Sequence, residues 1–216
     1  MCAESVSPSG DPESIGVGPW DGAIPDDPRL DLELLASGDR RNVMDRYRYW
    51  SMDAIVADLD TRRHPFHVAI ENFNHDFNIG SVVRTANAFL AAEVHIVGRA
   101  RWNRRGAMVT DRYQHVRHHA SAGDLAAWAA ENGLPLLGID NLPGAVPLET
   151  YDLPGACVLL FGQEGPGLSE AARVECGDVL SIAQFGSTRS INVGAAAAIA
   201  MHAWVRAHAE PGRLSP

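Results

Sequence analysis

Residues 181–199, SIAQFGSTRSINVGAAAAI, are the stretch that decides the fold of this chain. An apolar run, which predicts a strand, ends at Ile182, and a polar loop with Gly186 follows it. A helix is predicted from Ser190 through Gly194 and four consecutive alanines. This order brings bare backbone N–H groups to one place, where they can bind a ligand. An ordinary strand-to-helix connection with a capping Ser or Thr has the same local pattern.

Two segments upstream have the same form of strand, turn and helix. Residues 72–89, NFNHDFNIGSVVRTANAF, follow a short apolar strand, and residues 159–169, LLFGQEGPGLS, pass from a strand into a glycine-rich turn. Together the three segments resemble the three motifs of the SpoU branch of the SPOUT RNA methyltransferases. The motifs read N-x-G-x-x-x-R-T-A at 78–86, G-x-E-G-x-G-L at 162–168 and S-[IL]-N-V at 190–193. The resemblance covers roughly residues 64–208, and the occurrence of all three motifs in order argues against chance.

Apolar strands alternate with helices, which predicts an α/β fold with a mostly parallel sheet and helices on both faces. The expected strands are 66–71, 93–97, 134–139, 157–161 and 178–183, and the expected helices are 79–90, 123–132, 167–174 and 190–208. An arginine-rich loop is expected up to about residue 119, and a loop rich in Pro and Gly over 140–156. The resemblance implies, in addition, a SPOUT-type trefoil knot at the C-terminal end of the domain, against the general rule that chains are unknotted.

Two regions of different composition are expected. Residues 1–60 are an acidic N-terminal extension, and residues 61–216 contain the SpoU-like methyltransferase domain. Residues 1–38 are rich in Pro, Gly, Ser and Asp and poor in apolar residues, so we expect most of them to be disordered. A short helix is expected near 51–60, where apolar residues recur at helical spacing.

The net charge of −9 is unevenly distributed along the chain. Residues 1–60 hold 13 acidic residues and 5 arginines, whereas residues 61–216 hold 14 acidic residues and 13 arginines. Residues 99–119 alone hold six arginines against one aspartate. The body of the chain is therefore near neutral with one basic patch, which is compatible with a nucleic-acid partner.

Several features point to a cytoplasmic protein without membrane contact. No apolar run approaches the roughly 20 residues of a membrane span, and the N-terminus lacks the pattern of a signal peptide. The three cysteines, Cys2, Cys157 and Cys176, show no metal-binding spacing. We expect reduced thiols, with Cys157 and Cys176 buried.

Methylation of a ribose 2′-hydroxyl requires a held donor, an aligned hydroxyl and removal of its proton. The resemblance places Arg84 at that hydroxyl, although a guanidinium seldom gives up its proton. Arg84 acts either as a base beside a substrate phosphate or as a grip on that phosphate, and the sequence leaves both roles open. The resemblance assigns the other catalytic roles to Asn78, Glu164, Ser190 and Asn192. Asn78 is also a common helix-capping residue, and the two roles can coexist.

The resemblance implies S-adenosylmethionine as the methyl donor, bound through backbone groups and apolar contacts to its adenine. The residues expected to bind it are Gly138, Asp140, Asn141, Phe161, Gly162, Gly167, Ile182, Ser190, Ile191 and Asn192. Leu142 should border the same pocket.

The arginine-rich segment is expected to contact RNA, because arginines hold phosphates while aromatic and guanidinium planes stack on unpaired bases. The expected RNA-binding residues are Arg84, Arg101, Trp102, Arg104, Arg105, Arg112, His115 and Arg117. A solvated basic loop would have the same composition. His115, His118 and His119 lack companion ligands at metal-binding spacing, and no metal site is expected.

The expected function is methyl transfer from S-adenosylmethionine to a ribose 2′-hydroxyl of RNA by a homodimer, with tRNA favoured over rRNA. The preference for tRNA follows from the extension, which is too acidic and too poor in apolar residues to form a separate RNA-binding domain. The alternatives are an rRNA 2′-O-methyltransferase and a catalytically inactive RNA-binding protein of the same fold. A dinucleotide-binding enzyme would need G-x-G-x-x-G after its first strand, and residues 71–80 contain only Gly80.

Overall fold

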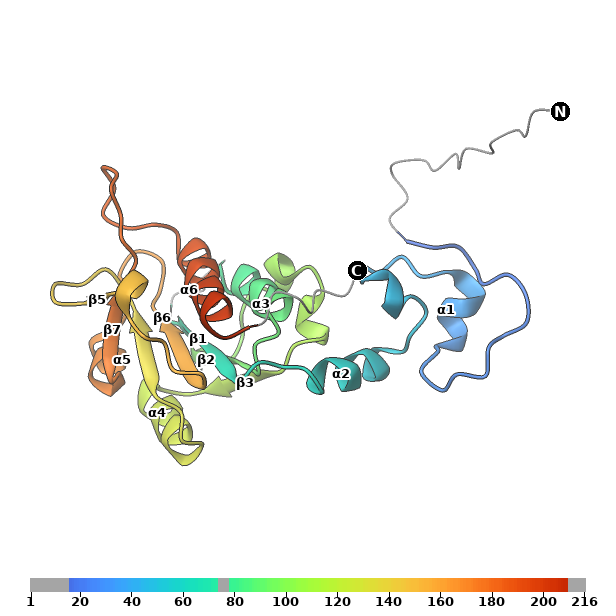
Figure 1. Ribbon diagram of the computed structural model, residues 1–216, viewed down its shortest axis with the longest axis horizontal. Coiled ribbons are helices and arrows are strands. Elements are labelled where there is room, and N and C mark those ends of the chain that lie inside the picture. Colours follow the sequence, from blue (N-terminus) through green and yellow to red (C-terminus); the bar gives the residue numbers. More distant parts are fainter. Residues whose placement is uncertain (1–15, 74–77, 210–216) are drawn as a thin grey trace. The chain divides into compact units, whose positions relative to one another are not determined.

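The computed structural model describes residues 16–73 and 78–209, and the chain divides into two compact units, 1–58 and 59–216 (Figure 1). The division falls two residues before the boundary that the composition predicts at residue 60.

The N-terminal unit contains α1 (Leu32–Ser37), η1 (Asp45–Tyr47) and most of α2 (Met52–Asp60). Helix α2 confirms the helix predicted near 51–60. The disorder expected up to about residue 38 is wrong from residue 16 onward, while residues 1–15 lie outside the described part of the chain.

The order of this unit depends on one buried carboxylate. Asp39 has no exposed surface, and its side chain accepts hydrogen bonds from Arg41 at 2.7 Å and from the backbone N–H of Tyr49 at 3.0 Å. Burial opposes ionisation, but these hydrogen bonds lower the pKa of Asp39 to about 2. Val17 pairs with the Asp39 backbone, and Leu35 is buried. A composition count misses such a local polar centre, which orders a segment with few apolar residues.

The second unit is built on one sheet of seven parallel strands. The strands are β1 (Phe66–Asn72), β2 (Val94–Gly98), β3 (Val116–His119), β4 (Leu136–Ile139), β5 (Val146–Pro147), β6 (Cys157–Phe161) and β7 (Asp178–Ser181). Their order across the sheet is β3-β2-β1-β6-β4-β7-β5, and every neighbouring pair is parallel. The central strand β6 is buried along its whole length, as its apolar sequence CVLLF predicts. The predicted α/β fold with a parallel sheet is confirmed, whereas the trefoil knot stays a prediction.

Helices cover both faces of this sheet (Figure 1). The helices are α3 (Ile79–Ala88), α4 (Ala122–Glu131), α5 (Glu170–Glu175) and α6 (Val193–His208). Alternation along β1 divides the core, since Phe66, Val68 and Ile70 pack with α3 and α6, while Ala69 packs with α4 and α5. All four helices were predicted, with α5 and α6 each beginning three residues later than expected.

Two strands were missed by the sequence analysis. Strand β3 lies inside the predicted arginine-rich loop, together with η2 (Arg104–Ala107) and η3 (Thr110–Arg112). It is a polar edge strand with only His119 buried, so it lacks an apolar pattern. Strand β5 has two exposed residues and lies in the predicted Pro/Gly loop, just before η4 (Leu148–Thr150). Edge strands that bury little surface leave little signal in a sequence.

Cys157 is buried and Cys176 is half-buried, and burial raises the pKa of each thiol to about 12. Both behave as small apolar residues, as expected. In the described ranges, no helix has the length and apolar character needed to cross a membrane.

Candidate functional site

The three sequence motifs meet at one edge of the sheet. They follow β1, β6 and β7, and the segment that begins at Asp140 follows β4. These strands are neighbours in the order β1-β6-β4-β7, so their carboxyl ends form one continuous edge. Ligands of open parallel sheets bind outside such an edge.

One hydrogen-bonded cluster joins a residue from each motif. The Asn78 side-chain amide donates to Glu164 Oε2 at 3.0 Å. The Asn192 amide donates to Asn78 Oδ1 at 2.9 Å and to Glu164 Oε2 at 3.1 Å. Glu164 Oε2 also accepts from the backbone N–H of Val193 at 3.2 Å. The carboxylate therefore holds the start of α3 and the start of α6 to the glycine-rich turn.

Asn192 caps α6, whereas Asn78 does not cap α3. The Asn192 side-chain oxygen accepts from the backbone N–H groups of Gly194 at 2.9 Å and Ala195 at 3.2 Å. Asn78 stands at the N-cap position of α3 but makes no side-chain bond to that helix. The capping role considered for Asn78 is therefore wrong, because its side chain is used between motifs.

A cavity of about 140 Å³ lies beside this cluster. Its wall comes from the segments that follow β4, β6 and β7 and from the start of α6. The lining residues are Ile139, Asp140, Asn141, Leu142, Phe161, Gly162, Gln163, Glu164, Gly165, Pro166, Gly167, Ile182, Gln184, Ser190, Ile191, Val193 and Ala196.

The glycine-rich turn needs its glycines because it folds back on itself. Gln163 and Gly167 exchange backbone hydrogen bonds of 3.0 Å in each direction. A Cβ on Gly162 would overlap the backbone of Gly167 and Leu168. Gly167 has a φ of +73°, and a Cβ there would overlap the Asp140 carboxylate.

Asp140 fixes the turn from the neighbouring strand. Its carboxylate accepts from the backbone N–H groups of Leu168 at 2.9 Å and Asn141 at 2.7 Å. Asn141 in turn donates to the backbone oxygen of Arg189, in the loop before α6. Asp140 and Asn141 thus tie the turn and the loop around the cavity.

Eight of the ten residues predicted to bind a cofactor line the cavity, and two do not. Gly138 lies behind it, where a Cβ would stand 2.8 Å from Leu168 Cδ1 and 3.0 Å from Cys176 Sγ. Asn192 belongs to the hydrogen-bonded cluster instead. Leu142 also borders the cavity, as predicted. Seven lining residues were not among the predicted site residues, although four lie inside the motifs and three lie close to predicted site residues in the sequence: Gln163, Gly165, Pro166 and Val193, and Ile139, Gln184 and Ala196.

Arg84 stands apart from the cavity on the exposed side of α3. It lies one helical turn after Ser81, whose Cβ is close to Gly194 of α6. Among the described residues, no ion pair or side-chain hydrogen bond engages the Arg84 guanidinium. This cation is free to bind an external anion.

The expected RNA-binding residues lie in two different places. Arg101, Arg104 and Arg105 are exposed after β2, at the carboxyl end of the sheet, and Trp102 is half-buried. The guanidinium of Arg104 lies 5.6 Å from the centre of the Trp102 ring. Arg112 is exposed in η3 of the same segment. This segment packs against the start of α3, where a Cβ on Gly80 would stand 2.6 Å from the Ala107 backbone nitrogen.

His115 and Arg117 lie at the opposite, amino end of the sheet and already have acidic partners. His115 Nε2 is 2.8 Å from Asp60 Oδ1, and Arg117 Nε is 3.1 Å from both carboxylate oxygens of Glu93. His118 and His119 do not join His115, because His118 bonds to a backbone oxygen and His119 points into the sheet.

Comparisons with known proteins agree with the motif positions. The model of the SpoU rRNA Methylase family matches residues 65–202. The chain is 31% identical over 199 residues to an uncharacterized tRNA/rRNA methyltransferase of Mycolicibacterium vanbaalenii, covering 83% of this chain and 60% of that protein. It is 27% identical over 153 residues to the tRNA (guanosine(18)-2′-O)-methyltransferase of Escherichia coli, covering 69% of this chain and 67% of that protein.

The fold also resembles a solved structure with a bound cofactor. The SpoU methyltransferase AviRb from Streptomyces viridochromogenes, in complex with AdoMet, superposes with a TM-score of 0.60 at 26% identity. The match covers 69% of this chain and 60% of that one. The chain thus spans only part of the length of several of the proteins it resembles.

Proposed function

The chain belongs to the SpoU rRNA Methylase family, and from that premise we propose that it transfers a methyl group from S-adenosylmethionine to a ribose 2′-hydroxyl of RNA. The observation that carries the proposal is the cluster of Asn78, Glu164 and Asn192, because it joins all three motifs beside one cavity. The names of the related proteins support an RNA substrate, and one of them specifies a 2′-O-methylation.

The lining of the cavity suits the adenosine part of S-adenosylmethionine. Apolar side chains of Ile139, Ile182 and Ile191 can contact the adenine, while backbone groups of the glycine-rich turn supply donors and acceptors. The close approach at Gly162 and Gly167 leaves that backbone bare. When bound, S-adenosylmethionine supplies a methyl group on a positively charged sulfur.

The residues around the cavity then have separate roles. Glu164 and Asn192 hold the walls in place through their shared hydrogen bonds. Ser190 is exposed at the cavity rim, where its hydroxyl can contact the donor or the ribose. We assign Arg84 to gripping the RNA phosphate next to that ribose, because a guanidinium retains its proton and binds phosphate well. The proton of the 2′-hydroxyl then passes to solvent as the new carbon–oxygen bond forms. Positioning then provides much of the rate.

We propose that RNA is held by the arginine-rich segment at the carboxyl end of the sheet, with Arg101, Arg104, Arg105 and Arg112. These four side chains are exposed, and Trp102 beside them can stack on an unpaired base. Arg104 has a loose ion pair of 3.5 Å with Asp111 and stays largely exposed. His115 and Arg117, which make closer contacts of 2.8 Å and 3.1 Å with acidic partners at the other end of the sheet, are the weaker candidates from the same list. We favour tRNA over rRNA, since the N-terminal unit has an excess of acidic residues and is unsuited to serve as a separate RNA-binding domain.

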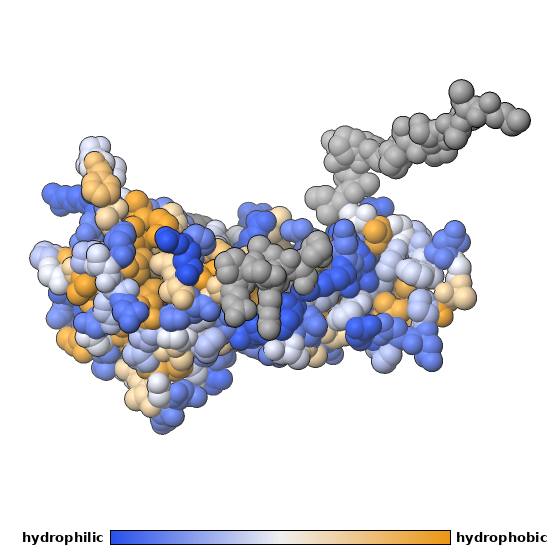
Figure 2. Space-filling model, viewed as in Figure 1, coloured by the Kyte–Doolittle hydropathy of each residue, from blue (hydrophilic) through white to orange (hydrophobic). Residues whose placement is uncertain are grey.

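We also propose a homodimer that works in the cytoplasm. Arg84 lies outside the cavity of its own chain, so a second copy could complete the site. Helix α6 begins with small residues and exposes Ile199, and hydrophobic residues gather around this helix on the face in Figure 2. Light scattering should give about twice the mass of 23.3 kDa at micromolar concentration. A monomeric mass would contradict the dimer.

The proposed function is tested by transfer of labelled methyl groups. Purified protein with labelled S-adenosylmethionine should label unmodified tRNA, and mapping should place the label on a ribose 2′-oxygen. Mapping of 2′-O-methyl groups in RNA from a strain that lacks the gene should then identify the missing nucleotide. Label in rRNA alone would support the rRNA alternative. Binding of RNA without any transfer would indicate an inactive RNA-binding protein.

A further inference from the structure

A row of three histidines crosses the face of the sheet that α4 covers. His67 on β1, His95 on β2 and His119 on β3 are linked in sequence by hydrogen bonds. His67 Nδ1 is 3.0 Å from His95 Nε2, and His95 Nδ1 is 2.9 Å from His119 Nε2. Apolar side chains occupy most other positions of β1 and β2, so this row is a polar interruption of the core.

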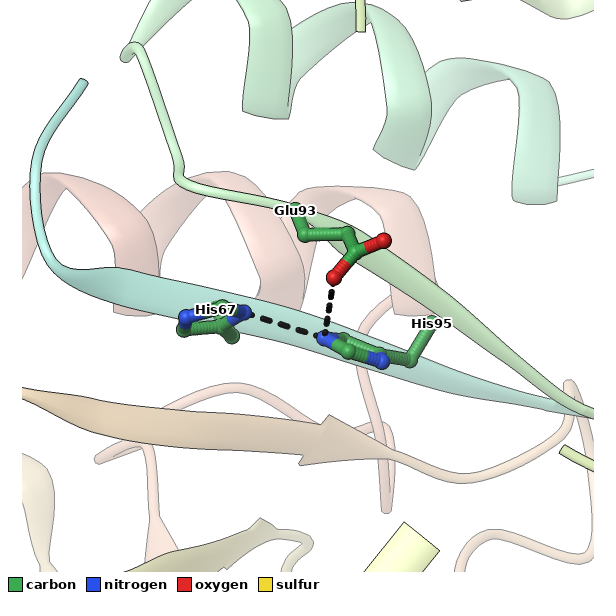
Figure 3. A group of neighbouring side chains, drawn as sticks. All are labelled: His67, Glu93 and His95. Atoms are coloured by element: carbon green, nitrogen blue, oxygen red, sulfur yellow. Dashed lines mark hydrogen bonds and ion pairs between the residues drawn. The ribbon is translucent and has the colours of Figure 1, made fainter. Parts of the chain in front are cut away.

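A carboxylate faces the same point as the first two histidines (Figure 3). Glu93 Oε2 lies 4.0 Å from His95 Nε2, and one ligand atom from each of His67, Glu93 and His95 falls within 4.8 Å of the others. His95 is fully buried, whereas His67 and Glu93 are partly exposed, so the group opens to solvent on one side. Within the parts of the chain that the structure describes, this is the group of three that could hold a metal ion.

We propose that His67, Glu93 and His95 bind a Zn²⁺ ion. Two imidazole nitrogens and one carboxylate oxygen form a ligand set that zinc favours, with water as the fourth ligand. Ligands about 2.0–2.2 Å from a tetrahedral ion lie roughly 3.3 Å from each other. The distances of 3.0 Å and 4.0 Å bracket that value, so small side-chain movements would close the site.

The neighbouring residues orient these ligands. When His67 Nδ1 and His95 Nε2 both bind the ion, His95 carries its proton on Nδ1. This N–H donates a hydrogen bond to His119 Nε2. Without the ion, one proton lies between His67 Nδ1 and His95 Nε2. When the ion binds, this proton moves to the other nitrogen of the ring that carries it, so the net charge of the two imidazoles is unchanged. Arg117 holds the Glu93 carboxylate from the side, and a carboxylate has lone pairs enough for both interactions. The positive charge of Arg117 lowers the affinity of the site for a cation but does not block the ligand atoms.

The neighbouring helix shields the row of histidines. The ring of Trp128 on α4 lies over the row, with centroid distances of 4.3 Å to His95 and 5.1 Å to His67. This aromatic cover excludes water from one side of the site.

The site lies at the amino end of β1 and β2, whereas the proposed donor cavity lies beyond the carboxyl ends of the strands. Zinc here would therefore clamp two strands rather than take part in methyl transfer. The site and the donor cavity can be tested independently.

Zinc binding is measured on the full chain by competition with a chromophoric chelator after treatment with EDTA. The wild type should bind one equivalent of Zn²⁺, and Co²⁺ in its place should give the visible bands of a four-coordinate ion. His67→Gln and Glu93→Gln should each weaken Zn²⁺ binding at least about tenfold, the lower end of the effect of removing a supporting residue. His202→Gln, an exposed histidine on the other face of the sheet, should leave binding unchanged.

Both test variants change partly exposed residues, so they are expected to fold, and circular dichroism checks this. Zn²⁺ should also raise the melting temperature of the wild type and of His202→Gln, but not of His67→Gln. Mg²⁺, which prefers oxygen ligands, should raise none of them. The proposal is overturned if the wild type binds no Zn²⁺, or if His67→Gln and Glu93→Gln bind it as tightly as the wild type.

Discussion

The carboxyl end and the amino end of the sheet are formed by the same strands but differ in how their polar groups are used. At the carboxyl end, glycines and exposed polar side chains leave backbone groups bare around a cavity. At the amino end, polar side chains lie inside the structure and are joined to one another, as His95 is to His67 and His119. Binding an organic ligand needs unsatisfied groups that face solvent, whereas the buried polar groups of the amino end are joined to one another and would exchange a hydrogen bond for a metal ion.

The largest expected effect lies at the carboxyl end, in catalysis. Arg84→Ala should reduce methyl transfer by at least about 10²-fold, the lower range for a group that assists proton removal or positions a substrate. The guanidinium has no partner within the described residues, so its removal should leave the fold and donor binding intact. Turnover is measured with labelled donor and RNA. An Arg84→Ala variant with wild-type turnover would remove this residue from the mechanism.

The second effect concerns the glycine-rich turn. Gly162→Val would force a side chain into the backbone of Gly167 and Leu168. Overpacking costs about 1–3 kcal/mol, which corresponds to roughly 5–150-fold weaker binding of S-adenosylmethionine if the turn must distort. Calorimetry measures this affinity. Gly186→Val is the matched control, since no atom lies within 4 Å of its Cβ position. Equal affinity in the two variants would place the donor elsewhere.

The third effect belongs to the amino end and appears as a pH dependence of stability. Because the folded pKa of His95 lies near 2, below the ordinary 6.5, its unfolded form binds a proton first as the pH falls. The free energy of unfolding, which is unaffected by His95 above pH 6.5, should then fall by up to about 1.4 kcal/mol per pH unit. Urea unfolding with EDTA, at pH values from about 7.5 to 5, measures the slope. Replacement by Leu (His95→Leu) should flatten it, and an unchanged slope would contradict the prediction.

The smallest effect tests which end of the sheet binds RNA. Arg104→Ala with Arg105→Ala should weaken RNA binding and lower the slope of log affinity against log salt by roughly 0.7–0.9 for each phosphate that the protein no longer neutralises. Arg117→Ala, which removes an arginine already paired with Glu93, should change the slope less. Salt titrations of RNA binding by the two variants measure both slopes. A larger change for Arg117→Ala would move the RNA surface to the amino end of the sheet.

The carboxyl end was predicted far better than the amino end, for a physical reason. Ligand loops of this kind need glycines and capping residues at fixed positions along the chain, so the motifs around Asn78, Glu164 and Asn192 could be read locally. The contact between His67 and His95 depends on the pairing of two strands, and strand order leaves no mark in a single sequence. The same limit hid β3, whose exposed residues carry no apolar pattern. Asp39 was missed because its partners, Arg41 and Tyr49, matter only once the segment has folded.

The hydrogen bond between Asn78 and Asn192 spans 114 residues, and that between Asn78 and Glu164 spans 86. Contacts of such long range require the closure of long loops, which the pairing of β1 with β6, from Phe66 to Cys157, requires as well. The strands can pair while the cavity still lacks its wall from α6. A ligand in the finished cavity would stabilise this last docking step above all others. Under the proposed function, the donor is a folding partner as well as a substrate, and depletion of S-adenosylmethionine is expected to loosen helix α6 before the sheet.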